Sequence, residues 1–372
     1  MRSGSTLRLI VSLLVLVGVT ALVATRIIDG SRSRAAVPAA ATKIDVTPRP
    51  VPAAPAAPAT PALPADPGPL PALLADPARL PCFGAASEDP GRPCVNPRLR
   101  GTVYPTPTDA RGAQRYDRCR RRFDRDLLRI CFWGATQGTA TRTIAILGDS
   151  HASHWRAAMQ TVVAAKRWRA ISISRAACPL TLAHPDLPGT ARQAGCVAWN
   201  QQVQAYVRAH PSITAVFVGA HRGRVIPPPG QTMGAARRAG YLTAWRRLRA
   251  GAVRHVVVFR DTPRVRGATL RCVDGALAAG RPAGIACALP RAYALPPDPE
   301  ALAAASDPAH VQVADLASAF CDARLCRPVI GGALVLRDVS HMTTTFSATL
   351  GPRLLRTVNR LTAGWRDGRV PG

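Results

Sequence analysis

Two short motifs contain the residue types of a nucleophilic triad, although they stand far apart in the chain. One is Gly148-Asp149-Ser150-His151, and the other is Asp338-Val-Ser-His341. A carboxylate three residues before a histidine in a loop can accept a hydrogen bond from one imidazole nitrogen, while the other nitrogen faces a serine hydroxyl. His341 would then take the proton of Ser150 and later return it, while Asp338 would stabilise the imidazolium. The motifs predict Ser150 as a nucleophile, although serine at a helix start is also a common N-cap.

The segments around these motifs alternate between short apolar runs and longer amphipathic ones. We expect strands at 143–147, 170–174, 213–218, 253–259 and 311–316, and helices at 151–166, 193–208, 235–250 and 345–361. Unbroken apolar strands that alternate with helices indicate an α/β fold with a parallel sheet covered on both faces. Ligands bind such folds at the carboxyl ends of the strands, and Ser150 follows the first strand directly. At a helix start, free backbone N–H groups also favour a developing oxyanion.

Further blocks identify a family resemblance. These blocks are Leu147-Gly-Asp-Ser-His-Ala-Ser-His-Trp155, Ala177-Cys-Pro179 after the second strand, and Asp261-Thr-Pro263 after the fourth. With Asp338 and His341, they make residues 81–372 similar to the SGNH hydrolase superfamily. More narrowly, the chain resembles the SGNH domain attached to membrane acyltransferases that O-acetylate cell-surface polysaccharides. The resemblance implies a three-layer, flavodoxin-like fold, a triad of Ser150, Asp338 and His341, and an acyl-serine intermediate.

The oxyanion donors are less well defined by this resemblance. The wider superfamily uses a glycine after the second strand and an asparagine after the third, whereas this chain has Arg175-Ala-Ala-Cys178 and Gly219-Ala-His-Arg-Gly223. A backbone N–H near Ala177 is a candidate for the first donor, and the side chain of His221 or Arg222 for the second. His151 is expected to shape the site. The alternative is that these residues are structural.

Metal and cofactor binding are not expected. His151 and His154 are three residues apart, but no third ligand stands at a supporting spacing, and Trp155 suggests packing. The ten cysteines include no Cys-x-x-Cys pair, which disfavours a zinc ribbon or a thioredoxin motif. In sequence order they fall into five brackets, and nearest-neighbour disulfides would join Cys82/Cys94, Cys119/Cys131, Cys178/Cys196, Cys272/Cys287 and Cys321/Cys326. The sequence alone does not prove this connectivity, and the alternative is a set of buried free thiols in a cytosolic protein. An even number of paired cysteines favours disulfides in an exported compartment.

The strong positive charge does not indicate nucleic-acid binding. The formal net charge is +28, but the arginines are spread along the chain, and aromatic residues make up only 5%. Few aromatics mean few stacking platforms for bases. We interpret the charge as a solvated basic surface that anionic lipid or cell-wall polymer would attract.

The N-terminal part has the pattern of a membrane tether. Residues 9–25 are uncharged and lie between Arg8 and Arg26, and as a helix they would span about 25 Å, close to a hydrocarbon core of about 30 Å. No Ala-x-Ala cleavage site follows directly, so we expect an uncleaved signal-anchor with residues 1–8 in the cytoplasm. Residues 26–80 are rich in Ala and Pro and are expected to form an extended linker.

The remaining chain divides into an expected disulfide-stapled extension, 81–142, and a catalytic domain, 143–372. The function that the resemblance implies is O-acyl transfer, most simply of acetyl, to a cell-envelope polysaccharide outside the membrane. A single membrane helix cannot carry acyl groups across, so a separate multi-helix membrane acyltransferase is an expected partner. The alternatives are a carbohydrate acetylesterase and, in another class, a non-catalytic glycan-binding module.

Overall fold

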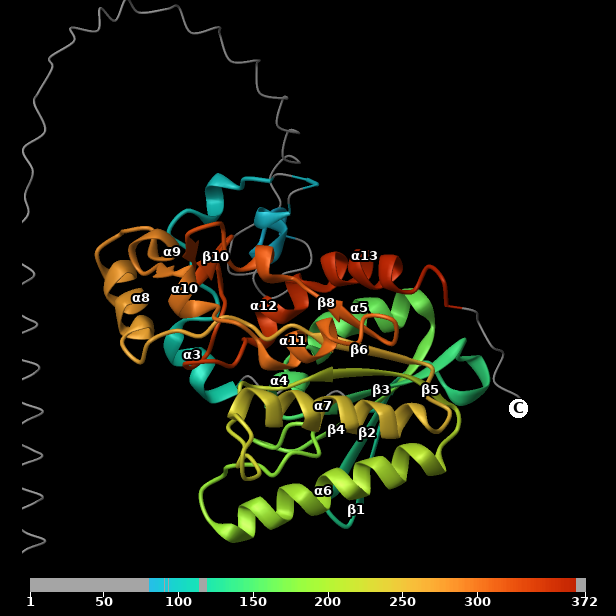
Figure 1. The fold of residues 1–372 in the computed structure, drawn as a ribbon. Coiled ribbons are helices and arrows are strands. Elements are labelled where there is room, and N and C mark those ends of the chain that lie inside the picture. The colour runs from blue at the N-terminus through green and yellow to red at the C-terminus, as the bar shows by residue number, and fades with distance from the viewer. Residues whose placement is uncertain (1–79, 90, 93, 114–118, 366–372) are drawn as a thin grey trace, which may run out of the picture. The chain divides into compact units, whose positions relative to one another are not determined.

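The described residues fold around a seven-stranded sheet with the strand order β1-β2-β4-β3-β5-β6-β8 (Figure 1). The computed structural model describes residues 80–89, 91–92, 94–113 and 119–365, so the expected anchor at 9–25 and nearly all of the linker at 26–80 lie outside the described residues. Among the residues described, no helix is long and apolar enough to cross a membrane. The strands are β1 Arg121–Arg125, β2 Leu128–Gly134, β3 Arg142–Gly148, β4 Trp168–Ser174, β5 Ile213–Gly219, β6 His255–Phe259 and β8 Val311–Ala314.

The sheet is mostly parallel, which confirms the predicted α/β class. β4, β3, β5, β6 and β8 run in one direction, and β2 joins β4 antiparallel. Each strand predicted in the parallel part is present, with ends that differ by two residues or fewer. Every residue of β3 is buried, as expected for a strand with both faces covered.

Helices cover both faces of the sheet (Figure 1). Ile144 and Ile146 belong to a core shared with α5 (Arg156–Lys166), α12 (Thr344–Thr349) and α13 (Gly351–Leu361). Their neighbours Ala145 and Leu147 point to the opposite core, which is shared with α6 (Thr190–Ala209) and α7 (Met233–Arg249). This alternation follows from the two-residue period of a strand. The other elements are α3 Pro107–Ala113, α4 Ser150–Ser153, α8 Thr269–Ala278, α9 Ala283–Ala286, α10 Arg291–Ala294, α11 Pro299–Ala305, β7 Leu289–Pro290, β9 Leu325–Cys326, β10 Val329–Ile330, β11 Ala333–Leu334 and the short 3₁₀ turns η2 Gly84–Glu88, η3 Pro97–Leu99, η4 Gln137–Thr139 and η5 Ala317–Ala319.

Two helices predicted as continuous are each broken. The segment 151–166 divides into α4 and α5, where the Ser347 hydroxyl donates to the carbonyl oxygen of His154 at 2.6 Å and competes with helical bonding. The segment 345–361 divides into α12 and α13, where Pro352 lacks the N–H that a continuous helix requires. The prediction of single helices was therefore wrong in both places.

The expected extension is not separate from the sheet. Ile130 of β2 pairs with Ile173 of β4, so β1 and β2, which belong to the expected extension at 81–142, form the edge of the same sheet. The earlier part packs on the C-terminal region, where Gly84 donates its N–H to the carbonyl oxygen of Gly331. The disulfides are Cys82–Cys94, Cys119–Cys131, Cys178–Cys196, Cys272–Cys287 and Cys321–Cys326, the five nearest-neighbour pairs.

Candidate active site

The carboxyl ends of the parallel strands bring the chemical motifs together. Gly148, at the end of β3, pairs in register with Ser174 of β4 and Gly219 of β5. Ser150 follows Gly148 by two residues, and Asp261 follows the end of β6 by two. The site therefore occupies the edge at which ligands bind in parallel α/β sheets.

The turn that carries Ser150 requires the preceding glycine. Gly148 has a φ of +141°, a conformation that favours glycine, and a Cβ there would lie 2.1 Å from the Gly219 carbonyl oxygen. Asp149 then joins two loops, because its carboxylate accepts the N–H of His151 at 2.7 Å and that of His221 at 2.9 Å. Burial raises the pKa of Asp149 despite these hydrogen bonds. The bond to His151 is local, whereas the bond to His221 depends on the sheet, which places the end of β5 beside that of β3.

Ser150, His341 and Asp338 form one line of polar contacts. His341 Nε2 lies 2.8 Å from Ser150 Oγ, and His341 Nδ1 lies 2.8 and 3.0 Å from the two Asp338 carboxylate oxygens. Asp338 also accepts the N–H groups of Ser340 and His341. Burial opposes the charge of Asp338, but the hydrogen bonds from His341 and the backbone hold its pKa well below the usual value. The carboxylate is therefore ionised, and the ring is placed to receive the Ser150 proton.

The helix start contributes less to an oxyanion than the sequence predicts. α4 has only four residues, and the N–H of His151 is already bonded to Asp149. That donor is therefore not available to a reacting carbonyl group.

The candidate oxyanion residues lie in different environments. Ala177 is exposed, has a φ of +57°, and lies in a turn whose Arg175 N–H donates to the carbonyl oxygen of Gly148. The His221 side chain is 43% exposed at the same edge of the sheet. Arg222 instead donates to the carbonyl oxygen of Pro296 at 3.1 Å and is only 12% exposed.

His151 is not a surface residue of the site. It is 2% exposed, and both ring nitrogens have partners, Asp261 Oδ1 at 2.6 Å and Ser340 Oγ at 3.3 Å. His151 was expected to shape the site, and the structure places it buried, next in sequence to Ser150 and bonded to protein atoms only. Asp261 was predicted from the sequence only as part of the block that carries the family resemblance. Its place just after a parallel strand was the signal that it belongs to the site.

His151, His221 and Asp261 also have the composition of a metal-binding group, with one possible ligand atom of each within 4.8 Å of the others. The geometry fits an ion poorly. Zinc ligands lie about 2.0–2.2 Å from the metal, which requires more separation than the 2.6 Å between His151 Nδ1 and Asp261 Oδ1. Arg222 Nε also lies 4.0 Å from Asp261 Oδ2 and already brings positive charge. We therefore interpret the group as a hydrogen-bonded one.

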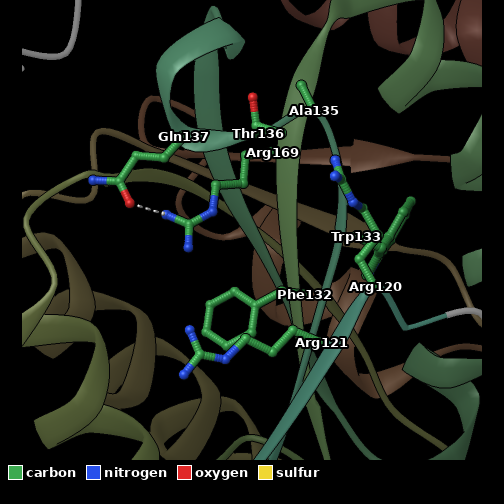
Figure 2. Close-up of a pocket in the computed structure, with 8 residues that line it drawn as sticks. All are labelled: Arg120, Arg121, Phe132, Trp133, Ala135, Thr136, Gln137 and Arg169. Carbon is green, nitrogen blue, oxygen red and sulfur yellow. Dashed lines mark hydrogen bonds between the residues drawn. The ribbon is translucent and has the colours of Figure 1, made fainter.

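A pocket shown in Figure 2 lies away from these residues. Its volume is about 330 Å³, and it is lined by Arg120, Arg121, Phe132, Trp133, Ala135, Thr136, Gln137 and Arg169. Arg169 belongs to the amino-terminal half of β4, whereas the reactive edge lies at the carboxyl end of that strand. Its guanidinium lies 5.1 Å from the ring centre of Phe132 and donates to Gln137. Three of its lining residues are arginines, and none is a triad residue.

Comparisons with known proteins give one family match and one similar solved structure. The sequence model of a family described as "SGNH domain (fused to AT3 domains)" matches residues 117–356, from just before β1 into α13. A solved structure of the periplasmic domain of a lipopolysaccharide acetyltransferase from Salmonella ser. Paratyphi A is similar, with 12% sequence identity and a TM-score of 0.44. That match covers 60% of this chain and 85% of the other chain. No curated protein matches the sequence.

Proposed function

The chain belongs to the family of SGNH domains that occur fused to AT3 domains, and from this premise we propose that it is an extracytoplasmic O-acyltransferase. The proposed acceptor is a hydroxyl group of a cell-envelope polysaccharide, and the proposed acyl group is acetyl. The observation that supports this most directly is the 2.8 Å contact between Ser150 Oγ and His341 Nε2, with Asp338 on the other ring nitrogen.

In the first proposed half-reaction, Ser150 Oγ attacks the acyl carbon of an ester or thioester donor. The bond between Oγ and the acyl carbon forms as His341 Nε2 takes the hydroxyl proton. The bond from the acyl carbon to the donor's oxygen or sulfur then breaks, and the leaving group receives that proton. Asp338 stabilises the imidazolium between these steps.

In the second half-reaction, a sugar hydroxyl attacks acyl-Ser150. His341 takes the proton of the sugar hydroxyl, the new ester forms, and Ser150 Oγ leaves and regains the proton. Water in place of the sugar would make the same site an esterase. For the oxyanion of both tetrahedral intermediates we propose the backbone N–H near Ala177 and the His221 side chain as donors.

The proposed placement is outside the membrane, with residues 9–25 as anchor and 26–80 as linker. Five disulfides support an oxidising compartment. The family description names fusion to AT3 domains, which supports a separate AT3-type membrane protein as the source of acyl groups.

The test is the hydrolysis of p-nitrophenyl acetate by the full chain in detergent, compared with Ser150→Ala. We expect the alanine variant to be slower by at least about 10³-fold and to escape labelling by a fluorophosphonate. Equal rates would refute a catalytic Ser150 and leave the glycan-binding alternative. Transfer is distinguished from hydrolysis by adding an envelope polysaccharide and measuring acetylated sugar against free acetate.

A further inference from the structure

A second pair of carboxylate and imidazole lies directly behind the nucleophile. His151 Nδ1 is 2.6 Å from Asp261 Oδ1, and the two side chains are 3% and 1% exposed. His151 is the residue after Ser150, and its ring centre lies 5.1 Å from that of His341. The pair is thus shielded from solvent yet next to two members of the triad.

Hydrogen bonds with neighbouring residues fix the position of Asp261. Its Oδ1 also accepts the N–H of Thr262 at 2.8 Å, and its own N–H donates to Asp298 Oδ2 at 2.8 Å. Burial opposes the charge of Asp261, but the charge of His151 and its hydrogen bond hold the pKa of Asp261 well below the usual value. An ionised carboxylate with these partners is a rigid acceptor for the His151 ring.

The pKa of His151 is raised by its contact with Asp261. Burial alone would lower its pKa, but the charge of Asp261 and the hydrogen bond to it outweigh burial and raise the pKa above the usual value. With Nδ1–H directed to the ionised Asp261 carboxylate, Nε2 lies 3.3 Å from Ser340 Oγ, and one of these two atoms donates a hydrogen bond to the other.

Ser340 lies between the two triad residues of its loop and is held on two sides. Its hydroxyl meets His151, and its carbonyl oxygen accepts from Thr262 Oγ1 at 3.4 Å. Its N–H donates to Asp338 Oδ1 at 2.9 Å. A movement of Ser340 would therefore move the carboxylate that orients His341.

We propose that Asp261 and His151 are positioning residues that act through Ser340 to hold Asp338 and His341 against Ser150. This inference rests on the proposed function, since it assumes that the triad is catalytic. Displacement of a reacting group by about 1 Å can cost about 10²-fold in rate, so a loosened turn would have a measurable effect.

A direct role of His151 in proton transfer from substrate is less compatible with the geometry. The ring is almost fully buried, and both nitrogens are already directed to protein atoms. His341 already faces the Ser150 hydroxyl. His151 therefore supports the site without touching the reacting atoms.

The kinetic test is a double-mutant cycle of His151→Asn and Ser340→Ala in the full chain in detergent. With p-nitrophenyl acetate, we expect each single variant to lower kcat by about 10- to 100-fold, with KM little changed. The double variant should be no slower than the more impaired single variant, because both remove one contact. The proposal is wrong if the fold-losses in kcat of the two single variants multiply in the double variant, or if Ser340→Ala leaves kcat unchanged.

A spectroscopic readout separates positioning from general damage. In the wild-type protein we expect two far-downfield proton signals, one from His151 Nδ1–H and one from His341 Nδ1–H, assigned with His151→Asn and His341→Asn. Ser340→Ala should retain the first signal and shift or broaden the second. If the His341 signal is unchanged while kcat falls, Ser340 does not position His341 and the proposal is wrong.

Controls keep the test interpretable. Asp307 and His310 form an exposed pair with the same 2.6 Å contact, at the amino end of β8, so His310→Asn should leave kcat unchanged. Ser340→Ala is expected to fold, because the backbone bonds Val265–Val339 and Arg337–His341 remain. If Ser150→Ala hydrolyses as fast as wild type, the proposed function fails, whereas the downfield signals still report on the geometry of the turn.

Discussion

The backbones of Gly148 and Gly219 approach so closely that a Cβ on Gly148 would lie 2.1 Å from the Gly219 carbonyl oxygen. This approach joins the ends of β3 and β5 and sets the direction of the turn into Ser150.

Gly148→Ala should therefore destabilise the protein by at least about 3 kcal/mol, since the φ of +141° and the contact with a carbonyl oxygen are both unfavourable for alanine. Thermal unfolding measures the loss. Gly267→Ala is the matched control, because nothing lies within 4 Å of its Cβ position. A similar melting temperature for both variants would contradict the argument.

Asp338→Asn should lower kcat for p-nitrophenyl acetate by about 10³- to 10⁴-fold with little change in KM. The amide can donate to His341 Nδ1, which selects the wrong tautomer for a base at Nε2. Steady-state kinetics provide the measurement. Asp307→Asn, in the exposed Asp307–His310 pair, should be as active as wild type. A loss below about tenfold would show that Asp338 does not orient the base.

His221→Ala should lower kcat by about 10²-fold if its ring is an oxyanion donor, the scale for removal of one such donor. His221→Asn, which supplies an amide N–H instead, should recover part of that loss. Single-turnover acylation rates test both variants. Full activity in His221→Ala would remove this residue from the site.

The melting temperature of Glu300→Gln minus that of the wild type should be larger at pH 8 than at pH 5. Burial, together with the charges of Asp298, Asp149 and Asp261, raises the pKa of Glu300 well above its usual value. In the wild type, the stabilisation linked to the raised pKa of Glu300 is fully present below the unfolded-state pKa of about 4.3. It is lost as the pH rises through the folded-state pKa. The melting temperatures of the variant and the wild type should therefore diverge between pH 5 and pH 8, by about 2–4 °C for each kcal/mol of difference in the free energy of unfolding. A difference independent of pH would exclude this origin.

The proposed anchor predicts that the chain stays in the membrane fraction after an alkaline carbonate wash. Leu14→Arg combined with Val17→Arg should release it, because each arginine at the centre of a span costs about 3 kcal/mol. A second measurement tests the placement outside the membrane, by cysteine alkylation before and after reduction. Because all ten cysteines are in disulfides, they should react only after reduction. Retention of the double-arginine variant would contradict the anchor at 9–25.

The parallel strands and the motif next to β3 could be predicted because their signals are local. Five apolar residues at 143–147, followed by Gly148-Asp149-Ser150, specify a buried strand and a turn without reference to distant residues. Asp338 and His341 are close enough in the chain to meet within one turn. The disulfide partners are likewise near neighbours in sequence.

The tertiary structure decided what depends on contacts between distant segments. Packing decides whether β2 joins β4 and whether Ser347 interrupts the helix after Ser150. The period of apolar residues predicts neither. The same holds for Asp261, His151 and Ser340, whose polar atoms meet only when three loops converge at one edge of the sheet. The sequence by itself determined the candidate chemistry of Ser150, Asp338 and His341, because residue type and local spacing encode it. Only the folded chain decided which buried groups support them, because hydrogen bonds between loops depend on positions that no local pattern records.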